Sequence, residues 1–253
     1  MNIDNFKKWG MERMSYSRLN SFKNYPSQFV INRIYGYDTG SSPAMSCGNV
    51  VEDMLHNYIL GNDINISSVL ESFAEKFADY HKQEDVIKYL KLIPKFYKNC
   101  EALFNKMGNY KLHSYQEELH TEILGIPFIG LTDFVFDMGD ELFVYDLKTK
   151  GQMKINHSDK LQQWIYKKAL EEKYNKPVTC HLYIVTPIKH HFEEIVFNYS
   201  HEVEIHNILK GMDKVFEFCN DKKDFAFLYQ PNLDDFIWNR PQIIQARKEI
   251  WGI

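Results

Sequence analysis

Residues 130–149 read GLTDFVFDMGDELFVYDLKT, two apolar runs separated by a Gly-Asp pair. Glycine at the first central position suits a type II′ turn, so the stretch predicts a β-hairpin with Gly139-Asp140 as its loop. With that loop, Asp133 lies directly opposite Asp146. Side chains alternate along a strand, so Lys148 points the same way as Asp146. We therefore expect two carboxylates and a lysine at one place on this hairpin.

This trio has two interpretations. Asp-x-Lys is common by chance, and an exposed strand face often carries charges. The neighbours Val144, Tyr145 and Leu147 are apolar, however, and burying a carboxylate among apolar side chains is costly unless a cation or hydrogen bonds compensate. Opposed residues have Cβ atoms about 5 Å apart, which lets two carboxylates share one divalent cation. The hairpin therefore favours a metal-dependent phosphodiesterase site.

The composition is that of a folded protein of moderate size. With 253 residues, 44% of them apolar, we expect one globular domain over residues 1–253. The net charge of −4 gives no general signature of nucleic-acid binding. The four cysteines are scattered without a C-x2-C pair, which argues against zinc or a redox dithiol and favours reduced, buried thiols. Neither a signal peptide nor a membrane span is recognisable, so a soluble, cytoplasmic protein with no membrane partner is expected.

Positive charge is concentrated directly after the hairpin. Residues 148–176 hold eight lysines and three acidic residues. A solvated helix face is the ordinary explanation, but next to a metal-site candidate the run favours a surface that follows the phosphates of a nucleic acid. Such contacts would make binding salt-dependent. The candidate DNA-binding residues are Lys150, Lys154, Lys160, Lys167, His157 and Ser17.

Helical and strand patterns alternate along the chain. Helices are expected from Ser17, the predicted N-cap, to the Tyr25-Pro26 break, at 28–35, at 48–60, at 67–107 with a break near Pro94, at about 157–174, near 201–219 and after Pro241. Residues 38–46 are expected to be loop. Strand character covers 112–149, with turns at Gly125-Ile126-Pro127 and Gly139-Asp140, and returns at 181–185 and 192–199. These patterns predict an α/β sandwich with a helical N-terminal and insert region (about 1–112), a catalytic sheet and helix (about 113–199) and a helical C-terminal region (about 200–253).

Three more side chains complete an ordered set. Glu52 follows Gly48 by one helical turn, and Gln162 and Tyr166 share one face of the next predicted helix. Each alone has an ordinary explanation as a surface or half-buried helix residue. The set Gly48-x-x-x-Glu52, Gly130-x-x-Asp133, Asp146-Leu147-Lys148, Gln162-x-x-x-Tyr166 resembles the PD-(D/E)XK nuclease superfamily, and most of all its RecB-type exonuclease branch. The phrase from Ser15 to Pro26 also resembles the N-terminal helix of that branch, so the resemblance covers roughly residues 15–60 and 115–186.

The resemblance implies a restriction-endonuclease-like core, a central mixed sheet flanked by helices, with a helical insertion and a helical C-terminus. It implies that Glu52, Asp133, Asp146 and the Leu147 backbone carbonyl bind Mg²⁺ or Mn²⁺, which prefer such oxygen ligands. Lys148 would stabilise charge on the reacting phosphate, and Gln162 and Tyr166 would position Lys148, the nucleophile or the phosphate.

The chain departs from the family pattern at two of these motifs. Thr132 stands where the family name has proline, and Glu52 stands where many members have histidine. Cys219 is the only late cysteine, whereas relatives with an iron–sulfur cluster have three, so no such cluster is expected. A P-loop pattern is also absent from the sequence, so no helicase motor is expected.

The function implied is a metal-dependent deoxyribonuclease, with an exonuclease on single-stranded DNA or duplex ends favoured. Its setting would be recombination, repair or replication, where proteins of those processes are possible partners. The small stand-alone format resembles phage-encoded members and the mitochondrial genome-maintenance exonuclease. A structure-specific or flap endonuclease, or a prespacer-trimming enzyme, is the alternative among enzymes. A catalytically idle module that binds DNA is the alternative from another class.

Overall fold

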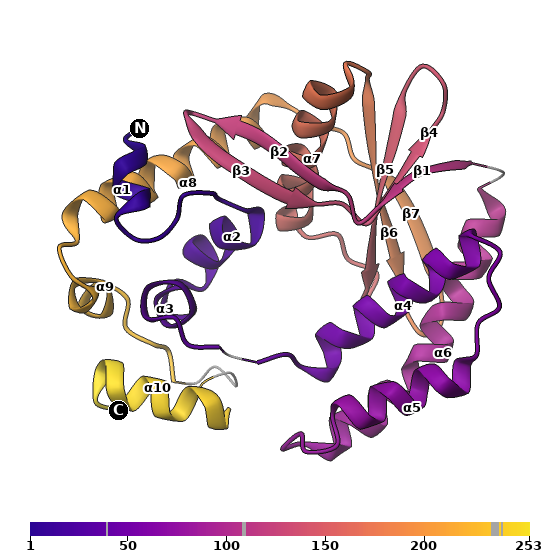
Figure 1. The fold of residues 1–253 in the computed structure, drawn as a ribbon, viewed down its shortest axis with the longest axis horizontal. Coiled ribbons are helices and arrows are strands. Elements are labelled where there is room, and N and C mark those ends of the chain that lie inside the picture. Colours follow the sequence, from indigo (N-terminus) through magenta and orange to yellow (C-terminus); the bar gives the residue numbers. More distant parts are fainter. Residues whose placement is uncertain (39, 108–109, 234–237, 239) are drawn as a thin grey trace. The chain divides into compact units, whose positions relative to one another are not determined.

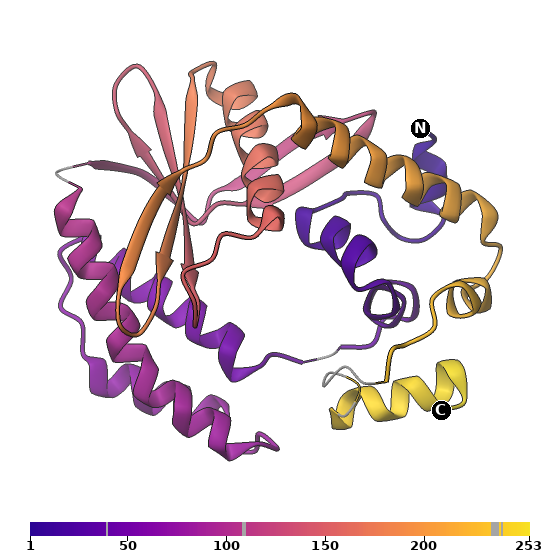
Figure 2. The same ribbon diagram turned by 180° about the vertical axis from the view of Figure 1, so that it is seen from behind.

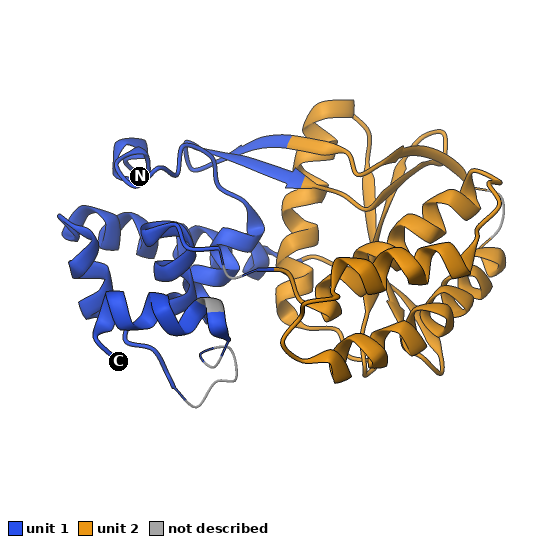
Figure 3. Ribbon diagram, turned by 60° about the horizontal axis from the view of Figure 1, so that its bottom comes forward, with its two compact units in different colours: residues 1–40, 120–130, 198–253 blue, residues 41–119, 131–197 orange. Residues whose placement is uncertain are grey.

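The computed structural model describes residues 1–253 apart from 39, 108–109, 234–237 and 239, and of residue 242 it describes the backbone alone. The chain divides into two compact units (Figure 3). The first unit comprises residues 1–40, 120–130 and 198–253, and the second comprises residues 41–119 and 131–197. The hairpin and every residue proposed to act in catalysis belong to the second unit. That residues 1–253 act as one nuclease domain stays a prediction.

A five-stranded mixed sheet is the centre of the second unit (Figure 1). Its strands, in spatial order, are β1 (Lys111–Tyr115), β4 (Phe134–Asp137), β5 (Leu142–Thr149), β6 (Val178–Val185) and β7 (His190–Glu194). Neighbouring strands are antiparallel except β5 and β6, which are parallel. The parallel pair is joined by helix α7 (His157–Tyr174), because parallel neighbours need a crossover connection. The bounds of α7 agree with the predicted 157–174.

The predicted hairpin is present with the predicted register. In the β4–β5 pair Phe136 lies opposite Phe143, and the N–H of Met138 donates to the carbonyl of Glu141 at 3.0 Å. Gly139 has a φ of +92°, the left-handed conformation that a glycine adopts without cost at the first central turn position. Asp133 directly precedes β4, so the same register brings it opposite Asp146 on β5.

Helices cover both faces of the sheet (Figures 1 and 2). One face packs against α4 (Pro43–Ile59) and α6 (Gln83–Lys106), and α5 (Ile66–Lys76) packs against α6. The buried strand residues on this face are Phe134, Phe136, Tyr145, Leu147, Tyr183 and Val185. The opposite face packs against α7 through the alternate positions Val135, Leu142, Val144, Val178, Cys180, Leu182 and Ile184. Since side chains alternate along β5, Asp146 and Lys148 belong to the face that α7 covers.

Two helix boundaries differ most from the sequence prediction. Helix α4 begins at Pro43, five residues before the predicted start, because Ser42 Oγ accepts the Met45 N–H and proline suits the first helical position. The predicted loop therefore ends at Ser42, and residue 39 within it lies outside the described residues. The helical break is at residues 77–82, whereas Pro94 lies inside α6.

The position of that break has a local cause. The Gln83 side-chain amide donates to the carbonyls of Phe77, Ala78 and Tyr80, which satisfies backbone groups at the end of α5. Proline inside α6 removes one helical hydrogen bond. The burial of neighbours on both sides of it, Ile93 and Phe96 among them, compensates for that loss.

The strand prediction was also incomplete. Strands β2 (Glu118–Ile123) and β3 (Ile126–Leu131) form a separate two-stranded sheet. The two turns predicted within 112–149 imply three strands, whereas five strands precede α7 in the described residues. The turn between them is at Leu124-Gly125, and Ile126 and Pro127 belong to β3. Strand β7 ends at Glu194, short of the predicted residue 199. Tyr199 instead begins α8, which Asn198 caps by accepting the Ser200 N–H.

The first unit is mainly helical. It contains α1 (Ile3–Lys7), α2 (Tyr16–Asn24), α3 (Pro26–Phe29), the π-helical segment η1 (Val30–Tyr35), α8 (Tyr199–Phe218), α9 (Lys222–Leu228) and α10 (Pro241–Trp251). Ser17 is not the N-cap of α2. Ser15 is, since its Oγ accepts the Arg18 N–H, and Ser17 lies in the first turn with its hydroxyl 2.9 Å from that of Ser15. In the described part of the chain, every helix is too short or too polar to cross a membrane.

Candidate active site

Asp146 and Lys148 form a buried ion pair on the α7 face of the sheet. The Asp146 side chain is fully buried, and Lys148 Nζ lies 2.6 Å from its Oδ2. Burial alone would lower the pKa of Lys148, but the charges of Asp146 and Asp133 outweigh it and hold that pKa above its ordinary value. Lys148 is therefore an ammonium ion, with a positive charge fixed beside two acids.

Asp133 is held by the backbone around it. Its side-chain Oδ2 accepts a hydrogen bond from the N–H of Leu147 at 2.7 Å, and its main-chain carbonyl accepts one from the N–H of Gln116 at 3.0 Å. Burial and the nearby charges of Asp146 and Glu52 raise the pKa of the Asp133 carboxyl well above its usual range. Three acids thus act on one another electrostatically, and this repulsion would be relieved by a cation.

Glu52 reaches this cluster from the helix on the other face of the sheet. Gly48, one turn earlier on α4, lies close to β5: a Cβ there would be 3.3 Å from Thr149 Oγ1. The glycine therefore permits a close approach of α4 to the strand that carries Asp146. Burial raises the pKa of the Glu52 carboxyl, Asp53 and Asp146 raise it further, and a hydrogen bond from Gln116 opposes them.

Gln162 and Tyr166 continue the chain of contacts from Lys148. Lys148 Nζ donates to Gln162 Oε1 at 3.4 Å, and Gln162 Nε2 donates to the Tyr166 hydroxyl at 2.7 Å. Tyr166 is 5% exposed, so burial fixes the position of the side chain at the end of this series of hydrogen bonds. The structure therefore brings together the six side chains Glu52, Asp133, Asp146, Lys148, Gln162 and Tyr166.

The donor set suits a hard divalent cation. Apart from the ion pair with Lys148, neither buried oxygen of Asp146 accepts a hydrogen bond from the described residues. Carboxylate oxygens left in this state fit Mg²⁺ or Mn²⁺, which prefer oxygen ligands. No group of three His, Cys, Asp or Glu side chains in the described ranges is already arranged to hold a metal ion. Binding would thus require Glu52 to move closer or water to complete the shell.

Thr132 explains one departure from the family pattern. Its backbone N–H donates to the Glu117 carbonyl at 3.1 Å, and the residue is fully buried. A proline here would lack this hydrogen bond. Threonine therefore supports the chain just before Asp133 with a backbone contact that the proline of other members cannot make.

The lysines proposed to bind DNA have different surroundings. Lys150 Nζ lies 2.6 Å from Asp159 Oδ2 and also donates to the Lys154 carbonyl. These contacts join the loop before α7 to the first turn of that helix. Lys167 donates to Glu171 and to the Val178 carbonyl, linking α7 to β6. The Lys154 and His157 side chains are exposed, Lys160 is half-buried, and Ser17 lies in the other compact unit. DNA contacts by these residues stay predictions.

Gln116 and Tyr115 are contacts of the acidic cluster that the sequence did not indicate. Gln116 Nε2 donates to Glu52 Oε1 at 3.2 Å and to the Tyr115 hydroxyl at 3.0 Å. Tyr115 in turn donates to Asp53 Oδ1 at 2.6 Å. They lie at the end of β1, outside every motif of the resemblance, so only the folded structure reveals them.

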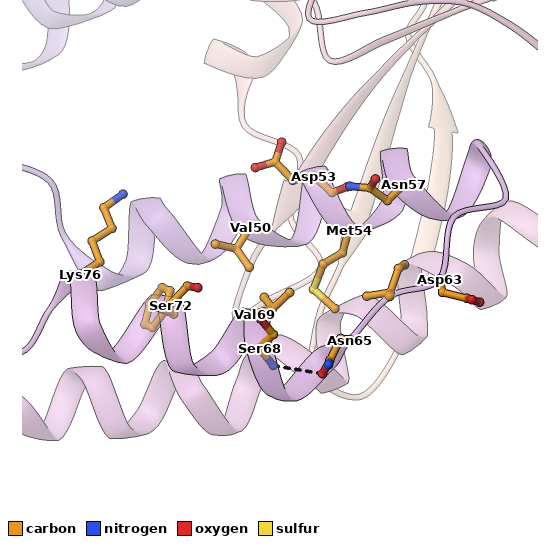
Figure 4. A pocket seen from close by; sticks show the side chains of 12 residues that line it. Val50, Asp53, Met54, Asn57, Asp63, Asn65, Ser68, Val69, Ser72 and Lys76 are labelled. Carbon is orange, nitrogen blue, oxygen red and sulfur yellow. Dashed lines mark hydrogen bonds between the residues drawn. The ribbon is translucent and has the colours of Figure 1, made fainter.

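A cavity of about 470 Å³ lies between α4 and α5 (Figure 4). Its apolar lining includes Val50 and Met54, and Asp53 and Lys76 lie at its polar edge. None of the six clustered side chains lines it. The cavity is therefore separate from the acidic cluster, although Asp53 follows Glu52 on the same helix.

Comparison with known proteins agrees with this geometry. The sequence pattern of the PD-(D/E)XK nuclease superfamily matches residues 13–232. Among solved structures, a protein from Eubacterium rectale described as a candidate exonuclease is 13% identical with a TM-score of 0.54, covering 100% of this chain and 99% of that chain. Another, SSO0001, is 14% identical and covers 65% of this chain and 83% of that chain, but its TM-score of 0.34 supports no conclusion. Comparison with curated proteins found no match.

The chain belongs to the PD-(D/E)XK nuclease superfamily, since the match covers most of its length. The restriction-endonuclease-like fold expected from the sequence is confirmed. Membership implies a metal-dependent nuclease with DNA as its substrate, and members generally use divalent ions such as Mg²⁺ or Mn²⁺.

Proposed function

We propose that this protein is a Mg²⁺- or Mn²⁺-dependent DNA exonuclease. It hydrolyses phosphodiester bonds of single-stranded DNA or of duplex ends, in recombination, repair or replication. The observation that carries the proposal is the continuous series of contacts from Asp146 through Lys148 and Gln162 to Tyr166, beside Asp133 and Glu52. The preference for free ends is supported by the fold shared with a candidate exonuclease.

The residues divide into those that bind the cation and those that act on the phosphate. Asp133, Asp146, Glu52 and the Leu147 carbonyl would hold the divalent ion. When bound, that ion lowers the pKa of a coordinated water and offsets negative charge on the phosphate.

Lys148 then acts as an electrostatic group. In the metal-free protein Asp146 and Asp133 raise the pKa of Lys148 and favour its ammonium form. As an ammonium it would orient the attacking water and stabilise the phosphate oxygens as negative charge grows on them. The water oxygen forms a bond to phosphorus and gives up a proton to solvent, while the bond to the leaving oxygen breaks and that oxygen takes up a proton from solvent. Gln162 accepts a hydrogen bond from Lys148 and keeps it on the α7 face during this step.

The test is digestion of end-labelled single-stranded, duplex and covalently closed circular DNA with Mg²⁺, Mn²⁺ or EDTA. Lys148→Ala and Asp146→Asn test the cluster, and Asp140→Asn, which changes an exposed turn carboxylate on the same hairpin, is the matched control. We expect metal-dependent loss of linear DNA by wild type and the control, and none by the two cluster variants. Cutting of circles would indicate an endonuclease. Binding without cleavage in either metal would contradict the catalytic proposal and indicate a DNA-binding module.

A further inference from the structure

Gln116 has an unusual backbone for its residue type. It lies in the short connection between β1 and β2 with a φ of +48°, in the left-handed region that glycine and asparagine adopt more readily. A glutamine in this conformation is strained unless the surrounding contacts compensate.

Gln116 contacts two residues that are proposed to bind the cation, the carboxylate of Glu52 and the main-chain carbonyl of Asp133. Its backbone N–H donates to the carbonyl of Asp133 at 3.0 Å, and its side-chain Nε2 donates to Glu52 Oε1 at 3.2 Å. Asp133 precedes β4 and Glu52 is on α4, so the two acids come from separate elements. Gln116 is therefore a bridge between them, with one group for each.

The bridge is itself supported by a fixed aromatic ring. The Tyr115 hydroxyl accepts a hydrogen bond from Gln116 Nε2 at 3.0 Å and donates one to Asp53 at 2.6 Å. The Tyr115 ring stacks on His56 of α4 with 3.7 Å between ring centroids and an angle of 17°. Tyr115 is thus joined to α4 at two points, which restricts the directions open to the neighbouring amide.

We propose that Gln116 is a positioning residue of the metal site: its amide aims Glu52, and its backbone holds Asp133, so that both face the same cation. This inference rests on the proposed function. A carboxylate ligand is generally oriented by a hydrogen bond from a residue outside the ligand set, and losing such a partner typically lowers metal affinity about 10-fold to 100-fold. Since Gln116 is exposed, it contributes little to the core, so its replacement separates positioning from folding.

The test compares two variants that remove the amide in different ways. Gln116→Met keeps the length of the side chain without its donor, whereas Gln116→Gly also relieves the left-handed backbone. The matched control is Leu124→Gly, because Leu124 has the same kind of backbone, with a φ of +53°, at the turn between β2 and β3. Two readouts are needed: the rise in Tm with Mn²⁺ concentration without DNA, and the Mg²⁺ concentration that gives half-maximal cleavage.

Both Gln116 variants are expected to raise the half-saturating metal concentration about 10-fold or more in both readouts. Their Tm without metal should fall little, and Leu124→Gly should keep the wild-type metal dependence. Unchanged half-saturation in both Gln116 variants, with active wild type and inactive Asp146→Asn, would overturn this inference and leave the proposed function standing. Wild type that neither binds Mn²⁺ nor cleaves DNA would overturn both.

Discussion

His181 should make the stability of the protein fall between neutral and mildly acidic pH. It lies on β6 with 4% of its surface exposed, among the rings of Phe143, Tyr145 and Phe192, at centroid distances of 5.0, 4.9 and 4.6 Å. Its Nδ1 is buried without a hydrogen-bond partner in the described residues. Burial therefore lowers the pKa of His181 to about 4, from an ordinary value of 6.5.

The sign of the effect follows from proton binding. Between pH 6.5 and about 4 the unfolded chain carries a proton on this histidine and the folded protein does not, so acid favours unfolding. The full stability is present above pH 6.5. Each pH unit between the two pKa values is worth about 1.4 kcal/mol, so this group alone removes about 2 kcal/mol by about pH 5 and about 3 kcal/mol by about pH 4.

The assay is urea unfolding of wild type and His181→Phe, followed by tryptophan fluorescence across this pH range. Phenylalanine fits the aromatic surroundings and binds no proton, so the difference in free energy of unfolding between the two proteins isolates this histidine. We expect that difference to grow by about 2 kcal/mol, in favour of the variant, from about pH 8 to about pH 5. A difference that stays constant with pH would refute the burial of a neutral imidazole.

Three further predictions concern other charges and caps. Lys148→Met leaves the buried Asp146 carboxylate without the lysine ammonium, so the free energy of unfolding of the metal-free protein in urea should fall by about 2 kcal/mol or more. Mg²⁺ should restore part of this loss. Equal stability of the variant with and without Mg²⁺ would contradict the prediction. Lys150→Ala should lower Tm because it breaks a half-buried ion pair, whereas Lys154→Ala should keep Tm and reduce the slope of log affinity for DNA against log salt by about 1. A salt slope in the Lys154→Ala variant equal to that of the wild type would exclude that lysine from the DNA contacts. Ser15→Ala should cost about 1 kcal/mol and Ser17→Ala almost nothing, and the reverse order in thermal unfolding would restore the original N-cap prediction.

The hairpin and α7 could be predicted because their signals are local. A glycine turn fixes the register of two short strands, so Asp133 is opposite Asp146 whatever packs around them. The helix from His157 to Tyr174 has a capping acid and an apolar stripe within its own sequence. Neither inference depends on a distant part of the chain.

The features that were missed depend on distant contacts. Pro94 looks like a break in the sequence, but the apolar face of α6 packs against the sheet and keeps the helix continuous. The left-handed backbone of Gln116 has no sequence signal, because glutamine is not a usual residue for it. Its two acidic partners are 64 residues before it and 17 residues after it, so the bridge exists only after folding.

The site combines a contiguous part with one distant part. The segment 133–166 supplies both aspartates, the lysine and the Gln162–Tyr166 pair, and its contacts form within one hairpin and the helix that follows. Glu52 reaches the same place only if α4 passes close to β5, which the absence of a side chain at Gly48 permits. A cation that needs Glu52 would thus favour the conformation in which α4 is seated on the sheet. Metal binding is therefore expected to be coupled to the docking of α4, and Gln116, which joins Glu52 to Asp133, is where that coupling should be strongest.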